Sequence, residues 1–340
     1  MFSFFFFLIF SLFCTQGFAA SFSGLGPVPI RNQNPLALQS LNMRPQGATV
    51  LPNRKFEVEM DLAYSSIFER HFIAAPNLQT PHPTTGYQLA LDMELLRQAF
   101  FFHYGFLDRY EVGMEIPFIS MTGGFLDSFT EGFHQAFGFP NGGRQYFDKG
   151  LFAYSIQQNG TTVYQVNQQD YGLSDIVFDF KHQILIEKKY LPALASVFYF
   201  KIPTGSSGNG FGSGNPDFGF QLALEKNYHR YHGYLNLAYL VVGGNDQLSS
   251  ISNHYLFSWM TAFEMNLVRE ALSGIIQISG DTPLFDQTGI STMDNGALNL
   301  TVGFAGKVWE QHQWKIAFEE DLDPTSSAMD FTAWLQWSYR

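Results

Sequence analysis

The stretch Phe331-Thr332-Ala333-Trp334-Leu335-Gln336-Trp337-Ser338-Tyr339, just before the final residue, decides the fold of this chain. Apolar side chains occupy positions 331, 333, 335, 337 and 339, with polar residues at 332, 336 and 338 between them. A period of two describes a β-strand with one apolar face. Chain ends of soluble proteins fray unless they are tied down, whereas bacterial outer-membrane barrels end on an aromatic-rich strand. The segment therefore predicts the closing strand of a membrane β-barrel.

The opposite end of the chain carries the pattern of an export signal. Residues 1–20 hold no acidic or basic side chain, contain the apolar run 4–10, and end on Gly17-Phe18-Ala19-Ala20. An apolar core before small residues predicts a cleaved signal peptide over residues 1–20, with an uncleaved membrane anchor as the alternative. The single cysteine, Cys14, lies in this segment, so the expected mature chain has no thiol for a disulfide, metal or nucleophile.

Composition narrows the class further. The net charge is -11 and no basic run is present, so nucleic acid is not an expected partner. After the leader, no stretch approaches the roughly 18 apolar residues of a spanning helix. The apolar fraction is 46% while the mean hydropathy is only -0.06, so apolar and polar residues must be interleaved. This interleaving is typical of a membrane barrel.

Alternating segments recur along the chain, and we count twelve, with ten to fourteen left open. The first places Phe56 and every second residue to Tyr64 on one face, with three acids between them. The second runs from Tyr87 toward Tyr104 and changes phase near Leu96, which suggests a bulge. An even count puts both termini on the periplasmic side.

The expected connections alternate in length. Short ones lie at 105–109, 187–190, 228–232, 268–271 and 309–313, and long ones at 70–86, 120–171, 204–216, 243–254, 283–295 and 323–329. Short periplasmic turns and long outer loops are typical of outer-membrane barrels. We therefore predict an all-β, transmembrane, antiparallel up-and-down β-barrel over residues 55–340, in the bacterial outer membrane.

One long extracellular loop, residues 121–170, carries a helical pattern. Phe125, Phe129, Phe133 and Phe137 recur every four residues and so share one face of a helix at about 125–137. This face could pack on the barrel rim, lie in the outer-leaflet interface, or fold inward as a constriction. The segment 21–54, rich in Pro, Asn and Gln, is expected to be periplasmic or to enter the lumen as a plug.

The inward faces of the expected strands carry more acid than base. A water-filled lumen of this kind would attract cations, whereas in a closed lumen the acids and bases would pair. We favour a narrow or gated pore. The candidate lumen-lining residues are Glu57, Glu59, Asp61, Asp92, Glu111, Glu115, Asp175, Asp179, Lys181, Asp217, Glu225, Glu264, Lys315 and Glu319.

Several blocks of sequence point to one family. They are the run Gly-Phe-Leu-Asp-Ser-Phe-x-Glu-Gly-Phe-His-x-Ala-Phe-Gly over 124–138, and residues 27–35, 58–70, 104–117, 201–205 and 319–322. Together they resemble the family named domain of unknown function 3187, across nearly the whole mature chain. The resemblance implies a Gram-negative outer-membrane protein and supplies no activity or catalytic residues.

The leading functional prediction is passage of a small, unidentified solute through the barrel. The alternatives are a lipase-like surface hydrolase and a structural or adhesion barrel. His182 and His254 lack a recognisable serine signature nearby, so catalysis is not expected, and neither is a cofactor or metal. The expected partners are outer-membrane lipid and, during biogenesis, the barrel insertion machinery.

Overall fold

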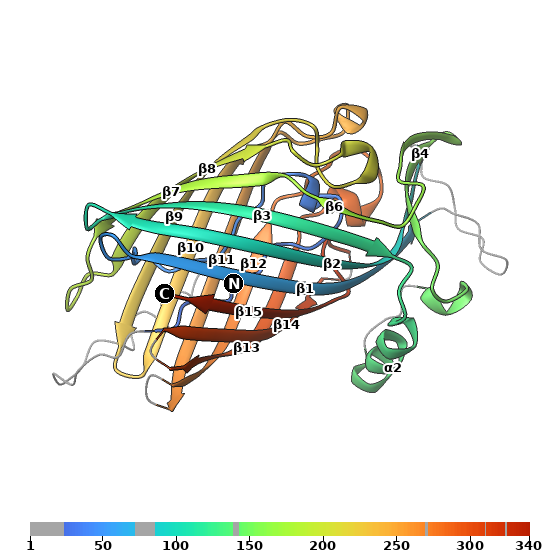
Figure 1. Ribbon diagram of the computed structural model, residues 1–340. Helices are drawn as coiled ribbons and strands as arrows, with labels where there is room; N and C mark the ends of the chain where they lie inside the picture. The colour runs from blue at the N-terminus through green and yellow to red at the C-terminus, as the bar shows by residue number, and fades with distance from the viewer. Residues whose placement is uncertain (1–23, 72–85, 139–142, 269–270, 310, 324) are drawn as a thin grey trace.

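The computed structural model describes residues 24–71, 86–138, 143–268, 271–309, 311–323 and 325–340, so the expected signal peptide lies outside the described residues. The chain forms a closed antiparallel barrel of twelve strands, as predicted (Figure 1). The wall strands are β1 (Phe56–His71), β2 (Tyr87–Phe106), β3 (Tyr110–Thr122), β7 (Ile176–Leu185), β8 (Ala193–Ile202), β9 (Asp217–Tyr228), β10 (Tyr231–Val241), β11 (Tyr255–Val268), β12 (Leu272–Asp281), β13 (Leu298–Val308), β14 (His312–Asp321) and β15 (Phe331–Tyr339).

No helix in the described part of the chain has the length and apolar character needed to cross a bilayer.

The last strand closes the cylinder. β15 pairs with β1 from Val58↔Tyr339 to Ser66↔Phe331, and on its other edge with β14. The prediction for residues 331–339 is therefore confirmed. Leu335 and Trp337 are exposed on the outer face, while Thr332, Trp334, Gln336 and Ser338 are buried on the inner one. Alternate side chains of this strand thus face the lipid and the lumen.

Connections between wall strands sort by length onto the two ends of the barrel. Short turns such as Leu107–Arg109, between β2 and β3, lie at one end, which we call the turn rim. Leu107 and Asp108 have φ of 51° and 55°, the left-handed conformation that a tight hairpin needs. The long connections lie at the opposite end, which we call the loop rim.

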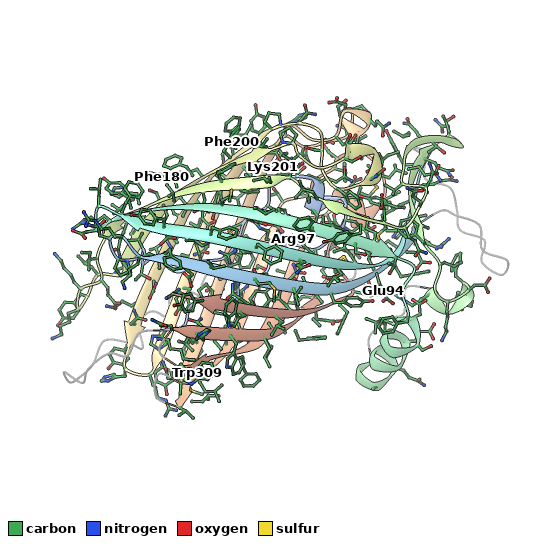
Figure 2. The ribbon with its side chains drawn as sticks, viewed as in Figure 1. Glu94, Arg97, Phe180, Phe200, Lys201 and Trp309 are labelled. Atoms are coloured by element: carbon green, nitrogen blue, oxygen red, sulfur yellow. The ribbon has the colours of Figure 1, made fainter. Side chains whose placement is uncertain are left out.

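The outer wall is covered by large apolar side chains. Phe180 and Phe200 point away from the barrel on neighbouring strands (Figure 2). Trp309 is 79% exposed at the turn rim, and Tyr255 is 67% exposed at the loop rim. Aromatic rings at both ends of an apolar band match the interfaces of a bilayer.

The wall is tallest at β1 and β2, and here one expectation is wrong. The pairing of β1 with β2 runs from Phe56↔Tyr104 to His71↔Leu89 without a shift in register, so no bulge lies near Leu96. Instead, the apolar face changes sides. Toward the turn rim, Phe100 and Phe102 face lipid; toward the loop rim, the apolar residues face inward.

This reversal has a physical cause. β2 has 20 residues, whereas about 9–11 suffice to cross the hydrocarbon core. Its upper part therefore projects beyond the lipid, and its apolar side chains find partners only inside the barrel. The inward residues Leu89, Leu91, Met93 and Leu95 are each at most 1% exposed.

The connection between β3 and β7 is a folded unit that extends the wall at the loop rim. Besides α2 (Asp127–Phe137), it holds the unpredicted strands β4 (Ala153–Gln158), β5 (Thr161–Gln165) and β6 (Asp170–Leu173). β4 extends the sheet from β2, and β6 pairs with the end of β3. A further short helix that was not predicted, α3 (Ser291–Asp294), lies in another outer loop.

The helix α2 differs in two ways from its prediction. It begins at Asp127, so Phe125 precedes it and is 78% exposed. It lies outside the barrel near the loop rim (Figure 1), so the expected alternative of an inward constriction is wrong. The side chains of Phe129, Phe133 and Phe137 lie outside the described residues.

A crosslink tests closure of the cylinder. Ser65 and Thr332 are Cα partners, and their hydroxyls lie 2.9 Å apart inside the barrel. Ser65→Cys with Thr332→Cys should therefore form a disulfide, seen as altered mobility of the unfolded chain on a gel. Ser65→Cys with Thr301→Cys, which lies on β13, is the control that should not crosslink. Absence of the bond in the first pair would contradict the pairing of β1 with β15.

Candidate functional site

The described N-terminal residues 24–54, which we call the plug, thread the lumen as an irregular hairpin. Near the turn rim, the carbonyl of Leu25 accepts a hydrogen bond from Gln313 at 2.7 Å. The chain rises to a short 3-10 helix at Ala37–Gln39 near the loop rim, visible inside the barrel in Figure 1. It then returns, and the N–H of Arg54 donates to the carbonyl of Gly105 at the turn rim (2.8 Å).

The plug is packed against the wall yet forms no β-ladder. Residues 24–48 are all buried or half-buried. Five prolines between 27 and 52 remove N–H donors and keep the chain extended. Irregular backbone is tolerated at membrane depth where protein groups satisfy it, so the wall side chains must supply most partners.

Wall carboxylates bind the N–H groups of the plug. Glu264 accepts from the N–H of Leu25 at 2.8 Å and also from Gly26. The same kind of contact recurs along the returning arm. There the N–H of Leu41 donates to Asp217 (2.7 Å), that of Ala48 to Glu225 (2.9 Å) and that of Leu51 to Glu111 (2.7 Å). Hydrogen bonds to charged acceptors are stronger than neutral ones, so these acids fix the path of the plug.

Two arginines of the plug bind further wall acids. Arg31 donates to Glu115 at 2.5 Å, and Glu115 is also bound by Arg97 of the wall. Arg44 lies 2.5 Å from Glu59 and 3.7 Å from Asp61, and its guanidinium stacks on Phe101 at 3.9 Å. Buried charges of this kind persist only when they are paired.

Neutral and basic wall residues bind the carbonyls of the plug. Gln277 makes two hydrogen bonds to the backbone of Val28, one to its N–H and one from the side-chain amide to its carbonyl. Lys315 donates to the carbonyl of Pro27 at 2.6 Å. Lys201 donates to the carbonyl of Gln39 at 3.1 Å. Its ammonium group also pairs with Asp175 (2.5 Å) and Asp217 (3.1 Å) of the wall.

Most of the candidate lumen residues do face inward. The following acids and lysines are buried on the inner side: Glu57, Glu59, Asp61, Glu111, Glu115, Asp175, Lys181, Asp217, Glu225, Glu264, Lys315 and Glu319. Asp179 also points inward and is half-buried. They are distributed around the whole circumference, and the plug brings several of them into one network.

Asp92 is the exception, and its assignment to the lumen is wrong. It shares the outer face of β2 with Glu94, because the residues on either side of it face inward. Arg70 donates to Asp92 at 2.8 Å, and Glu94 accepts from the N–H of Phe125 at 2.6 Å. Glu94 thus binds the start of the β3–β7 connection on the outer face of the wall, while Asp92 pairs with Arg70 of β1.

Arg144 anchors the same connection. It lies 2.6 Å from Asp127 at the start of α2 and 2.6 Å from Asp330 just before β15. Burial lowers the pKa of the Arg144 guanidinium, but the charges and hydrogen bonds of Asp330 and Asp127 outweigh it, so the net shift is upward. Arg144 therefore remains charged where it holds the loop.

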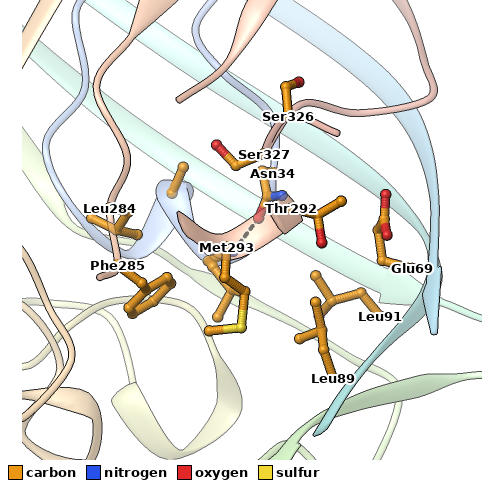
Figure 3. A pocket seen from close by; sticks show the side chains of 12 residues that line it. Asn34, Glu69, Leu89, Leu91, Leu284, Phe285, Thr292, Met293, Ser326 and Ser327 are labelled. Carbon is orange, nitrogen blue, oxygen red and sulfur yellow. Dashed lines mark hydrogen bonds between the residues drawn. The ribbon is translucent and has the colours of Figure 1, made fainter. Parts of the chain in front are cut away.

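The loop-rim half of the lumen holds a large apolar cluster. Leu36 and Leu38 of the plug join a cluster with the inward residues of β2 and with Ile119 and Met121 of β3. A cavity of about 20 Å³ remains between the plug tip and the outer loops, beside Asn34 and Met293 (Figure 3). It is large enough for about one water molecule, so the plug fills this half tightly.

The turn-rim half keeps more space. A cavity of about 510 Å³ lies beneath the plug, lined by Glu57, Glu111, Glu225, Lys181, Arg340 and other polar residues. His103 projects toward it, with Nδ1 3.5 Å from Glu111 and Nε2 3.9 Å from Glu59. In contrast, a cavity at mid-height beside Arg31 and Arg97 measures about 30 Å³.

The arrangement gives little support to hydrolysis. His182 stacks on Tyr110, and Nδ1 of His254 contacts the carbonyl of Val242 at 2.9 Å. At the loop rim, Glu69 and Thr292 both contact the same nitrogen of His71, at 2.5 and 3.1 Å. A catalytic histidine uses one nitrogen for its carboxylate and the other for the nucleophile. The contacts of Glu69 and Thr292 with a single nitrogen of His71 do not match that arrangement.

Metal ligation finds no support either. In the ranges that the structure describes, no group of three His, Cys, Asp or Glu side chains is arranged to hold a metal ion.

Sequence reasoning missed the plug residues that complete this network, chiefly Arg31 and Arg44. A signal was present, because residues 24–55 contain four basic residues and no acidic one, whereas the wall faces are acidic. Opposite charge on two segments predicts contact. No such signal marks the wall partners Gln277, Asn236, which binds the backbone of Gln46, and Trp334, which clusters with Leu25 and Val28.

Comparison with known proteins places this fold. The sequence model of the family described as "Protein of unknown function (DUF3187)" matches residues 7–340. A search of curated proteins finds no match. Among solved structures, the COG4313 outer membrane channel from Pseudomonas putida F1 is similar, with a TM-score of 0.54 and 12% identity over 86% of this chain and 97% of that one. The NanC porin covers 84% of this chain and 100% of its own, with a TM-score of 0.45 and 6% identity.

A stability measurement tests the arginine contacts. Arg44→Ala removes the cation between Glu59 and Asp61, and should lower the free energy of unfolding in urea by about 2 kcal/mol, because hydrogen bonds to charged groups contribute about 1.5–3 kcal/mol. Arg54→Ala, at an exposed position of the same segment, is the matched control and should change it by less than about 0.5 kcal/mol. Equal effects of the two changes would contradict the network.

Proposed function

Because the chain belongs to the family of proteins of unknown function DUF3187, whose description names no activity, we propose a function from its lumen. The protein is a gated outer-membrane channel for small solutes, and the plug is its gate. The turn rim faces the periplasm and the loop rim the cell exterior, in keeping with the length of the connections. We propose as well that residues 1–20 are cleaved as a signal peptide and that the barrel insertion machinery places the chain in the outer membrane.

One observation carries the proposal: the plug is bound by side chains rather than by a sheet ladder. When a wall carboxylate loses its hydrogen bond to an N–H group of the plug, a water molecule can donate to it instead. Such an exchange costs about 1.5–3 kcal/mol per hydrogen bond to a charged group. The plug contacts can break one at a time, so the closed population dominates and opening is rare.

The charges indicate what an opened lumen would prefer. Without the plug, acids such as Glu264, Glu225 and Glu59 would lose their plug donors, keep one neutral wall donor each, and face water. Among the inward basic groups, Lys201 keeps two acidic partners of the wall itself. The open lumen would then attract cations and repel anions.

The rival proposal, a permanently filled structural barrel, predicts that weakening the plug leaves the lumen closed. Planar-bilayer recording separates the two. The wild-type chain should give rare conductance steps, and Arg31→Ala with Arg44→Ala should raise the open fraction at least tenfold, with potassium preferred over chloride.

Arg54→Ala with Lys55→Ala is the control, because it removes the same charge from exposed residues at the end of the plug and just after it. It should leave the open fraction unchanged. An Arg31/Arg44 double variant that folds and stays silent would refute the gate.

A further inference from the structure

At β2 and β3, the lumen wall has two chemical zones along the barrel axis. On β3, the inward side chains in order from the turn rim are Glu111, Gly113, Glu115, Pro117, Ile119 and Met121. The last carboxylate and the first large apolar side chain, Glu115 and Ile119, are four residues apart, or about 13 Å along a strand. On this side of the barrel, the apolar zone lies toward the loop rim and the acidic zone toward the turn rim, whereas at β7–β9 the residues Asp175, Lys201 and Asp217 form a charged cluster at the loop rim.

The plug presents a complementary pattern to these zones. Its apolar side chains Leu36 and Leu38 pack in the apolar zone. Its guanidinium Arg31 reaches Glu115 where the two zones meet. The wall thus binds two groups of one plug segment at neighbouring sites. These are the apolar side chains of Leu36 and Leu38 and the planar cation of Arg31.

We propose that the plug mimics the solute, and that the channel takes small amphipathic cations. Such a solute has a guanidinium, amidinium or ammonium head and an aryl or short alkyl body. It enters at the loop rim, where the small cavity beside Asn34 and Met293 marks the contact between plug tip and loops (Figure 3). This inference rests on the proposed gate and names the class of solute for it.

Other solute classes fit the two zones less well. An anion would need free cations at the zone boundary, but Arg97 there is bound to Glu115. Lys201, a second basic side chain of the wall (Figure 2), is held by Asp175 and Asp217. A neutral sugar would bury hydroxyl groups in the apolar zone without partners, which costs free energy.

Competition for the plug sites tests the inference on the full chain in planar bilayers. Three probes are added from the loop-rim side: phenethylguanidinium, guanidinium without the apolar body, and 3-phenylpropionate with the opposite charge. Phenethylguanidinium should change the open fraction or block the current at concentrations at least tenfold lower than either of the others. This comparison of probes uses the wild-type chain, so no substitution disturbs its folding.

Glu115→Gln should raise the effective concentration of phenethylguanidinium about tenfold, whereas Glu187→Gln, in the turn between β7 and β8, should not. Equal potency of guanidinium would overturn the role of the apolar zone, and greater potency of 3-phenylpropionate would overturn the charge preference. Gating by Arg31→Ala with Arg44→Ala but no preference among the probes would refute this solute class alone. Silence of every folded variant would refute the gate as well.

Discussion

Carboxylates on the inner wall of the barrel, bound to the N–H groups and arginines of residues 24–54, are the interaction on which the structure depends. Without the plug, buried acids such as Glu264, Glu225 and Glu59 would keep only a neutral wall donor each, and poorly paired buried charge is unfavourable. The plug would likewise lack partners, because it forms neither helix nor ladder at membrane depth. Each component therefore satisfies the other, and the acidity of the wall is explained by the chain that it holds.

The same interaction divides the barrel into two functional halves. Toward the loop rim, Leu36 and Leu38 are packed in an apolar cluster and little space remains. Toward the turn rim, polar contacts border a cavity of about 510 Å³. A plug held tightly at its tip by packing and along its arms by separate hydrogen bonds is suited to reversible displacement rather than to a rigid core.

Alternation in the sequence predicts the wall well, because each strand must separate lipid from lumen. It predicts the closing strand at 331–339 and the sorting of connections onto two rims. It fails on β2, where the inward side of Leu89 and Leu91 depends on how far the strand rises above the lipid. It also places Asp92 wrongly, for the same reason. The path of the plug has no period, so only the lack of acids in residues 24–55 could have indicated its partners.

The most direct test locks the plug to the wall. The backbone N–H of Gln46 donates to the side chain of Asn236 at 2.7 Å, and that side chain donates back to its carbonyl at 3.0 Å. In the chain carrying Gln46→Cys and Asn236→Cys, the disulfide should abolish conductance steps in planar bilayers, and reduction should restore them. Equal conductance before and after reduction, with the crosslink shown to be formed, would contradict the account.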